Sequence, residues 1–377
     1  MLTTARKFSL VLVLWLTSIA FSETNIPLSV TSGVANTKFS IDGRIFLGLF
    51  ASEPDGSYPN RTFDIPDAKL RFVIQPAKNV ILVNRMSFSK TAAGGLDYCY
   101  LDLKDYLGWL PGHTFRIGRI KTDFGWEPYT DSPIDAITIT NSASNITGVD
   151  EGVMFLGRMS QLPLSYSLAV TNASKDVTGS SNGLAVTGKV SAFPTKQLTF
   201  AMSGYQTGNL VRDTASVECD LKFANLQKAP TGASSWQRSI WQVELLWNYD
   251  QSGKSIVAAN PEIPPYAITC AYGNLNDACQ SVSDRKASYY YVEGLYRITK
   301  AAYLATRFSE VELDDNGVEK LAGSPVVVNG YQRLSIACGY RIAEGVIVKV
   351  EGTQNTTDGG TKNPNINQLA LGFALKF

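Results

Sequence analysis

Charged residues recur at every second position within several otherwise apolar segments of the chain. The segment AKLRFVI alternates Lys69 and Arg71 with apolar residues, and FRIGRI does the same around Arg116. Because successive side chains of a β-strand point to opposite faces, each segment would have one apolar and one charged face. Charged groups that line a narrow passage replace part of the hydration shell of an ion. The sequence therefore predicts a basic arc on one face of a sheet, made of Arg44, Lys69, Arg71, Arg85, Arg116 and Arg333, with Lys349 beside the last of them.

A long polar segment, residues 121–149, holds the carboxylates that could oppose this arc. It begins with Lys121 and continues with Asp123, Glu127, Asp131 and Asp135. An acidic segment facing a basic wall creates a transverse field, which orients dipolar solutes and favours anions near the wall. A simpler interpretation stays open. Any water-filled interior needs polar side chains, and inward arginines and aspartates can pair across strands without selecting a solute.

The elements that would position these residues are strands. From residue 38 onward, segments with period-two character alternate with turns and loops, and each segment has roughly ten residues, as in outer-membrane barrels. The last segment, NQLALGFALKF, shows the alternation best. One of its faces carries Leu369, Leu371, Phe373, Leu375 and Phe377.

The spacing of the connections predicts how the strands are joined. Short turns fall near residues 75–79, 108–113, 160–163, 193–196, 225–236, 299–300 and 342–345, and longer loops near 51–63, 90–95, 121–149, 171–183, 207–213, 251–284, 311–327 and 353–366. We predict an all-β fold: a transmembrane antiparallel up-and-down β-barrel of about 16 strands, with the long third loop, residues 121–149, folded into the lumen. An all-β sandwich with core aromatics is the alternative.

The N-terminus has the features of an export signal. Arg6 and Lys7 precede an apolar stretch, residues 8–21, and small residues at Ala20 and Ser22 suit cleavage. This stretch is shorter than the roughly 20 residues that a membrane-spanning helix needs, and no later window is long and apolar enough. We therefore expect a secretory signal peptide at residues 1–22, a short periplasmic segment at 23–37 and an outer-membrane β-barrel at 38–377.

Composition disfavours several other functions. Lys+Arg 34 against Asp+Glu 33 gives no overall charge that would attract a nucleic acid. The single histidine, His113, falls in a predicted periplasmic turn, so the Ser/His and Asp/His arrangements of outer-membrane lipases and proteases cannot be assembled at the outer rim, and we expect it to be solvated. No residue spacing suits a metal site, and no cofactor is expected. Cys270 and Cys279 lie in a polar stretch and could form a disulfide after export.

Residues 98–127 read YCYLDLKDYLGWLPGHTFRIGRIKTDFGWE. This run is similar to a family pattern of the type AYLD…LPG…RxGxxKxxFGxE. The matching residues are Tyr100, Leu101, Asp102, Leu110, Pro111, Gly112, Arg116, Gly118, Lys121, Phe124, Gly125 and Glu127. The later segments YRITKAAYLATRFSEVE and QRLSIACGYRIAEGVIVKVEGTQN also look like the closing hairpins of that family. On these motifs the chain resembles the phosphate-selective porin O and P family.

The resemblance implies a 16-stranded outer-membrane porin that forms a homotrimer, and the terminal Phe377 resembles the recognition signal of bacterial outer-membrane barrels. With the basic arc, it predicts an anion-preferring channel for the passive diffusion of small hydrophilic solutes, phosphate among them, and no enzymatic activity. Outer-membrane lipid would be the surrounding partner. A second function stays open: a barrel acting mainly as a surface binding or structural protein, with residues 251–284 as its binding loop.

Overall fold

A computed structural model of the chain describes residues 37–54, 58–88, 95–106, 108, 111–127, 132–146, 148–159, 162–173, 184–207, 210–211, 235–248, 266–279, 282–313, 319–320, 327–328, 330–358 and 366–377. The signal peptide expected at 1–22 and nearly all of the segment expected at 23–37 lie outside these residues, so both stay predictions. Among the described residues, no helix has the length and apolar character needed to cross a membrane.

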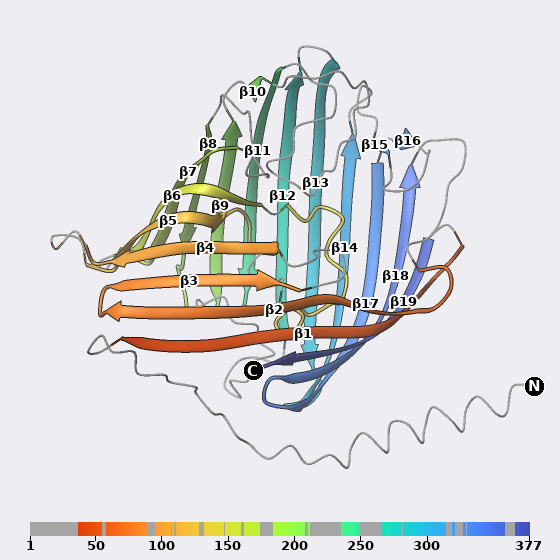
Figure 1. Cartoon of the computed structure of the whole chain (residues 1–377). Helices are drawn as coiled ribbons and strands as arrows, with labels where there is room; N and C mark the ends of the chain where they lie inside the picture. The colour runs from red at the N-terminus through yellow and green to blue at the C-terminus, as the bar shows by residue number, and fades with distance from the viewer. Residues whose placement is uncertain are drawn as a thin grey trace, which may run out of the picture.

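Sixteen strands of the described chain form one closed antiparallel sheet (Figure 1). They are β1 (Lys38–Ser52), β2 (Thr62–Ala77), β3 (Val80–Ser87), β4 (Gly95–Lys104), β5 (His113–Lys121), β6 (Val149–Arg158), β7 (Leu164–Thr171), β8 (Ala185–Ala192), β9 (Leu198–Thr207), β11 (Ser235–Trp247), β12 (Tyr266–Cys279), β13 (Val282–Arg297), β14 (Ala302–Leu313), β17 (Gly330–Ala343), β18 (Val346–Asp358) and β19 (Ile366–Lys376). The small strand β10 (Leu210–Val211) also pairs with β11, whereas β15 (Glu319–Lys320) and β16 (Val327–Val328) form a separate pair. Because β1 pairs with both β2 and β19, the sheet closes on itself. The predicted barrel is confirmed, and the sandwich is excluded.

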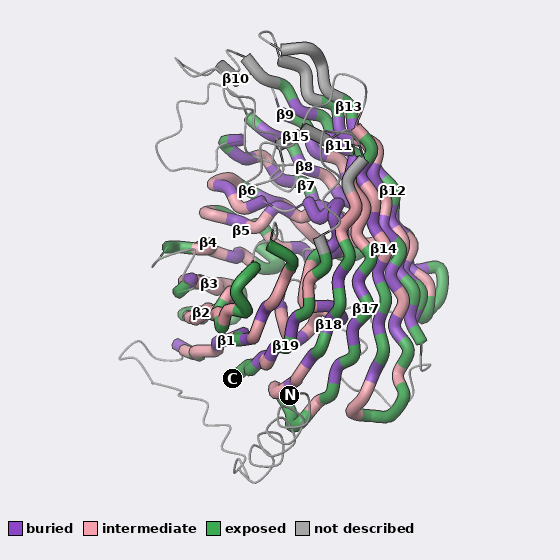
Figure 2. The backbone as a smooth tube through the Cα atoms, turned by 90° about the vertical axis from the view of Figure 1, so that its right-hand side faces the viewer, coloured by how far each residue is buried: buried purple, intermediate pink, exposed green. Residues whose placement is uncertain are grey.

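Alternating burial divides each strand into an outer and an inner row of side chains. In β9, Phe200 and Met202 are 45% and 60% exposed, whereas Ser203 is buried. The last strand follows the predicted pattern, since Leu369 is exposed and Ala370 is buried. Figure 2 shows the same alternation of buried and exposed residues along the strands. The outer row is apolar, as the lipid-facing side of a membrane barrel requires.

The barrel wall is not of uniform height. No strand from β3 to β9 has more than 10 residues, whereas the other main strands have 11 to 16. A transmembrane strand needs about 9–11 residues. The longer strands therefore extend beyond a bilayer.

Two predicted connections are wrong. The loop expected at 251–284 contains β12 and the start of β13, and only residues 280–281 separate these strands. Gly273, Asn274 and Asn276 lie in β12, and such residues usually indicate a turn. Asn274 and Asn276 belong to the outer row, which meets water beyond a membrane, and Gly273 belongs to the inner row, where the ring of Tyr289 lies against it. The turn expected at 225–236 is also wrong, since β9 pairs directly with β11, which begins at residue 235. The first error omits one strand and the second adds one, so the predicted number of strands is still about 16.

The same correction removes the suggested disulfide. Cys270 and Cys279 lie nine positions apart in one continuous strand, which separates them by about 30 Å at roughly 3.3 Å per residue. Cys270 is a free cysteine. The binding loop of the second functional hypothesis therefore has neither its predicted shape nor its predicted clip.

The connection between β5 and β6, residues 122–148, is named loop 3 below. Its described apolar residues pack against buried residues of the wall. Phe124 and Ala143 share one cluster with Tyr289, and Ile137 shares another with Tyr303. Each cluster combines loop residues with the inner rows of strands that are distant in sequence, so burial of apolar surface holds loop 3 against the wall.

Candidate functional site

A cavity of about 450 Å³ lies along the inner face of β1–β6. Its remaining sides are formed by residues of loop 3 and by the end of β19. Among the described residues that line it, seven are cationic and three are anionic. They are Arg44, Lys69, Arg71, Arg85, Arg116, Lys121 and Lys376, against Asp42, Asp123 and Asp135.

Cross-strand register brings four of these cations into two adjacent pairs. Arg44 pairs with Lys69, and Arg71 pairs with both Asp42 and Arg85. Direct antiparallel partners have Cβ atoms about 4.5–5.5 Å apart. Five of the six predicted basic residues therefore come together on β1, β2, β3 and β5. We call this set the cationic wall: Arg44, Lys69, Arg71, Arg85 and Arg116.

Every member of the cationic wall has a carboxylate partner, which lies on a directly neighbouring strand for the four arginines and on β4, two strands away, for Lys69. The N–O distances are 2.6 Å for Arg44–Asp67, Arg71–Asp42 and Arg85–Asp97, 2.7 Å for Arg116–Asp102, and 3.2 Å for Lys69–Asp97. The arginines therefore form ion pairs with aspartates across strands, as the interpretation without solute selection expected. Of these carboxylates only Asp42 lines the cavity, so on this wall the cavity meets mainly cations.

Two tyrosines of β4 support the guanidinium groups. The guanidinium carbon of Arg85 lies 4.1 Å from the ring centre of Tyr98, and that of Arg116 lies 3.9 Å from the ring centre of Tyr100. A cation over an aromatic face is attracted by the negative charge of that face. Neither tyrosine was predicted as a site residue, although the alternation in YCYLD places both on the inner face beside the basic residues.

Three of the five predicted loop residues line the same cavity: Lys121, Asp123 and Asp135. Asp123 lies 3.3 Å from Lys189 Nζ and accepts a 2.6 Å hydrogen bond from Ser167 Oγ. Asp131 lies outside the described residues. The loop therefore brings at least two carboxylates to a cavity whose opposite side is the cationic wall.

Glu127 and Arg333 lie elsewhere. Glu127 is buried and accepts hydrogen bonds from Ser142 N at 2.6 Å and Ser142 Oγ at 2.5 Å. Arg333 donates to the carbonyl oxygen of Asn141 at 2.7 Å and to Asn355 Oδ1 at 2.7 Å. Neither residue lines the cavity. Glu127 accepts its hydrogen bonds within loop 3, and Arg333 donates to loop 3 and to β18.

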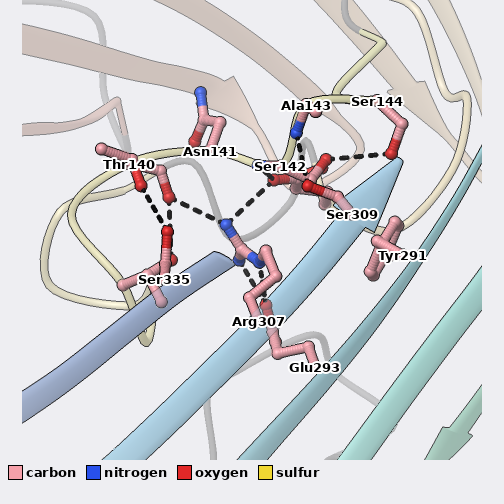
Figure 3. Close-up of polar contacts among 12 residues, drawn as sticks. Thr140, Asn141, Ser142, Ala143, Ser144, Tyr291, Glu293, Arg307, Ser309 and Ser335 are labelled. Atoms are coloured by element: carbon pink, nitrogen blue, oxygen red, sulfur yellow. Dashed lines mark hydrogen bonds and ion pairs between the residues drawn. The ribbon is translucent and has the colours of Figure 1, made fainter. Parts of the chain in front are cut away.

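Arg307 of β14 is at the centre of the contacts that hold the second half of loop 3 (Figure 3). Its side chain is 3% exposed. Its Nε donates to Glu293 Oε2 at 2.7 Å, and its Nη1 donates to the carbonyl oxygen of Thr140 at 2.8 Å. Nη1 also lies 3.2 Å from Glu127 Oε1. Arg307 thus joins a wall carboxylate, a loop carboxylate and a loop carbonyl.

Lys349 and Glu351 of β18 hold the middle of the loop. Lys349 Nζ donates to the carbonyl oxygens of Pro133, at 2.5 Å, and Ala136. Glu351 accepts hydrogen bonds from the main-chain N–H groups of Ile139 and, at 3.1 Å, Thr140. Lys349, which the sequence placed beside the basic arc, therefore binds loop main chain.

The first half of loop 3 is held in the same way by β8, β9 and β11. Gly125 N donates to Ser203 Oγ at 3.0 Å, its carbonyl oxygen accepts from Lys189 Nζ at 2.6 Å, and Trp126 N donates to Glu244 Oε1 at 2.7 Å. We call the inner-face residues that bind loop 3 the loop-binding wall: Lys189, Ser203, Glu244, Tyr303, Arg307, Ser309, Tyr331, Arg333, Lys349 and Glu351.

His113 is not the solvated turn residue that the sequence predicted. It begins β5 and is 7% exposed. Its ring lies 5.5 Å from that of Phe155 and 5.6 Å from that of Tyr166, and its Nδ1 lies 3.0 Å from the carbonyl oxygen of Pro111. Because β5 starts directly at this residue, the ring packs on neighbouring strands rather than entering water. It lies away from the residues that line the cavity.

No family model and no curated protein sequence matches the chain. Solved structures do match. Outer-membrane expressed OmpT of Vibrio cholerae has a TM-score of 0.61 and 11% identity, over 93% of this chain and 100% of that one. The outer membrane channel DcaP of Acinetobacter baumannii has a TM-score of 0.61 and 12% identity, over 93% and 99%. The anion-selective porin from Comamonas acidovorans has a TM-score of 0.59 and 8% identity, over 90% and 100%.

At these identities the likeness shows the fold. The chain has the closed antiparallel barrel of outer-membrane porins. Membership of the phosphate-selective O and P family stays a prediction.

Proposed function

We propose that this chain is an outer-membrane porin, a passive diffusion channel for small hydrophilic solutes that prefers anions. The observation that carries the proposal is a cavity inside a closed barrel, with five cations on one wall. Charged side chains at a constriction replace part of the hydration of an ion without holding it permanently. The fold shared with an outer membrane channel and an anion-selective porin supports this function. Passage needs no cofactor and no covalent step.

Loop 3 folds into the lumen and forms the constriction of the proposed channel. Its hydrogen bonds to the loop-binding wall and its apolar contacts with buried wall residues support this placement. The passage then runs between loop 3 and the cationic wall, with Asp123 and Asp135 opposite the cations. This arrangement gives a transverse field, and the excess of cations among the lining residues gives the anion preference.

The proposed site of action is the bacterial outer membrane, reached through the signal peptide at residues 1–22. The exposed apolar outer row would contact lipid. We further propose a homotrimer, since one of the similar OmpT structures is described as a trimer form. Light scattering of the purified barrel in detergent, corrected for the bound detergent, measures the oligomer directly.

The decisive experiment is single-channel recording of the purified, unsubstituted protein in a planar bilayer under a KCl gradient. We expect steady conductance and a reversal potential displaced toward the equilibrium potential of chloride. Added phosphate should carry current or reduce the chloride current. Detergent without protein is the control. Absence of conductance from a correctly folded barrel would contradict the channel and would favour a surface binding or structural barrel.

A further inference from the structure

The cavity beside the cationic wall also has an apolar side. Leu156 of β6 lines it beside the cationic wall, and Met154, which is 3% exposed, lies next to Leu156 on the same face. Met154 packs with Ile120 and Ala169, and Leu156 packs against the same cluster. These residues belong to the inner row of β6, where a channel for fully hydrated ions has no need of apolar side chains.

The nearest cation is held in a fixed position beside this apolar side. Arg116 is the direct cross-strand partner of Met154. Asp102 accepts hydrogen bonds from Arg116 Nε at 2.7 Å and from Nη2 at 3.0 Å, and the ring of Tyr100 lies under the guanidinium. These contacts keep the cationic group next to the methionine. A solute in the cavity therefore meets a positive charge and an apolar surface side by side.

We propose that the cavity selects carboxylates that carry a compact apolar body, such as aromatic or short branched monocarboxylates, over inorganic anions. This inference rests on the proposed porin function and names the solute class of that site. The carboxylate would lie against the cationic wall at Arg116 and Arg85, while the apolar body covers Leu156. Small-molecule sites of roughly 300–1,000 Å³ commonly combine an apolar lining with a few charged groups that fix orientation, and this cavity falls in that range.

Orthophosphate is the informative competitor. It has the charge that the cationic wall attracts, but it has no apolar surface to bury against Leu156. An apolar body gains free energy in proportion to the area that it removes from water, whereas a hydrated inorganic anion gains nothing there. The two anions therefore separate the contribution of charge from that of the apolar side.

The test is block of the chloride current through single channels by sodium benzoate and by sodium phosphate. We expect benzoate to halve the current at a concentration roughly fivefold or more below that of phosphate, which corresponds to burial of part of one ring. Leu156→Gln should weaken the block by benzoate roughly fivefold and leave the block by phosphate unchanged. Leu156→Met is the matched control and should retain the block by benzoate.

The outcomes distinguish this inference from the porin proposal. Normal KCl conductance with equal block by the two anions, or an unchanged block by benzoate in Leu156→Gln, overturns the solute class and leaves the porin standing. Loss of KCl conductance in the unsubstituted protein contradicts the porin itself. Calorimetric titration of the barrel in detergent with benzoate then tests the site independently, and absence of saturable binding overturns the inference.

Discussion

Arg71 and Arg307 are inward-facing arginines of the same closed sheet, but their surroundings differ. Arg71, in β2, has a side chain that is 41% exposed, forms an ion pair with Asp42 and lines the cavity. Arg307, in β14, is 3% exposed and bonds to Glu293, Glu127 and a loop carbonyl. One arginine is available to a solute, and the other is committed to the structure.

The difference follows from where loop 3 lies. Where the loop covers the wall, its main-chain N–H and C=O groups lose water and need partners, because an unpaired buried polar group is costly. Charged side chains of the loop-binding wall supply those partners, as Lys349 does for Pro133 and Glu351 for Thr140. Where the loop leaves the wall uncovered, the cations face the cavity instead. An inward charge therefore has one of two roles, set by what lies over it.

The largest expected effect comes from replacing Arg307, the arginine that binds loop 3. Arg307→Met leaves Glu127 and Glu293 buried without their shared cation. Removing one partner of a buried pair costs about 3–5 kcal/mol. The free energy of unfolding should fall by this amount, and the channel should become larger or noisier as loop 3 leaves the wall. Urea-induced unfolding followed by tryptophan fluorescence and single-channel recording measure the two effects.

Arg71→Met is the matched control for this substitution. Its ion pair is partly exposed, and such pairs contribute about 0–1 kcal/mol. A loss of stability as large as that of Arg307→Met would contradict the proposed division between the two walls.

A cross-link tests the movement of the loop itself. The hydroxyl oxygens of Thr140 and Ser335 lie 3.0 Å apart, so Thr140→Cys with Ser335→Cys, in a chain without its native cysteines, should form a disulfide. When these cysteines are combined with Arg307→Met, oxidation should restore the conductance of the unsubstituted protein, and reduction should return the conductance to that of Arg307→Met. If oxidation changes nothing, displacement of loop 3 is not the cause of the altered current.

Alternation explains why the sequence predicts so much of this arrangement. It places Arg44, Arg71 and Arg116 on the inner face, and the closed sheet then brings them together. The same alternation also places Arg333 and Lys349 inward, but it cannot show that loop 3 covers them. That depends on tertiary contacts between segments about 200 residues apart, such as Lys349 with Ala136. Long strands with polar ends, such as β12, were missed for a related reason, because their outer row changes from apolar to polar where the membrane ends.

The next effect concerns charge selectivity rather than stability. Arg116→Gln removes a cation that lines the cavity, whereas Arg333→Gln removes one that bonds to Asn141 and Asn355. One charge about 4 Å from an ion in water contributes roughly 1 kcal/mol, so Arg116→Gln should lower the ratio of chloride to potassium permeability roughly two- to fivefold. Arg333→Gln should leave that ratio unchanged. Reversal potentials under a KCl gradient measure both, and an equal shift in the two variants would show that the cavity does not set selectivity.

The smallest expected effect on ion selectivity comes from comparing two carboxylates of loop 3. Asp135 lines the cavity, whereas Glu127 is buried against Ser142 and Arg307. Asp135→Asn should raise the permeability ratio of chloride to potassium by up to roughly twofold, because salt screens this exposed charge, and it should not change stability. Glu127→Gln should lower the free energy of unfolding without changing the ratio, because its charge compensates Arg307 and does not reach the solute. If Glu127→Gln shifts the reversal potential as much as Asp135→Asn does, the field in the passage extends into the loop-binding wall, and the two walls do not act separately on a passing ion.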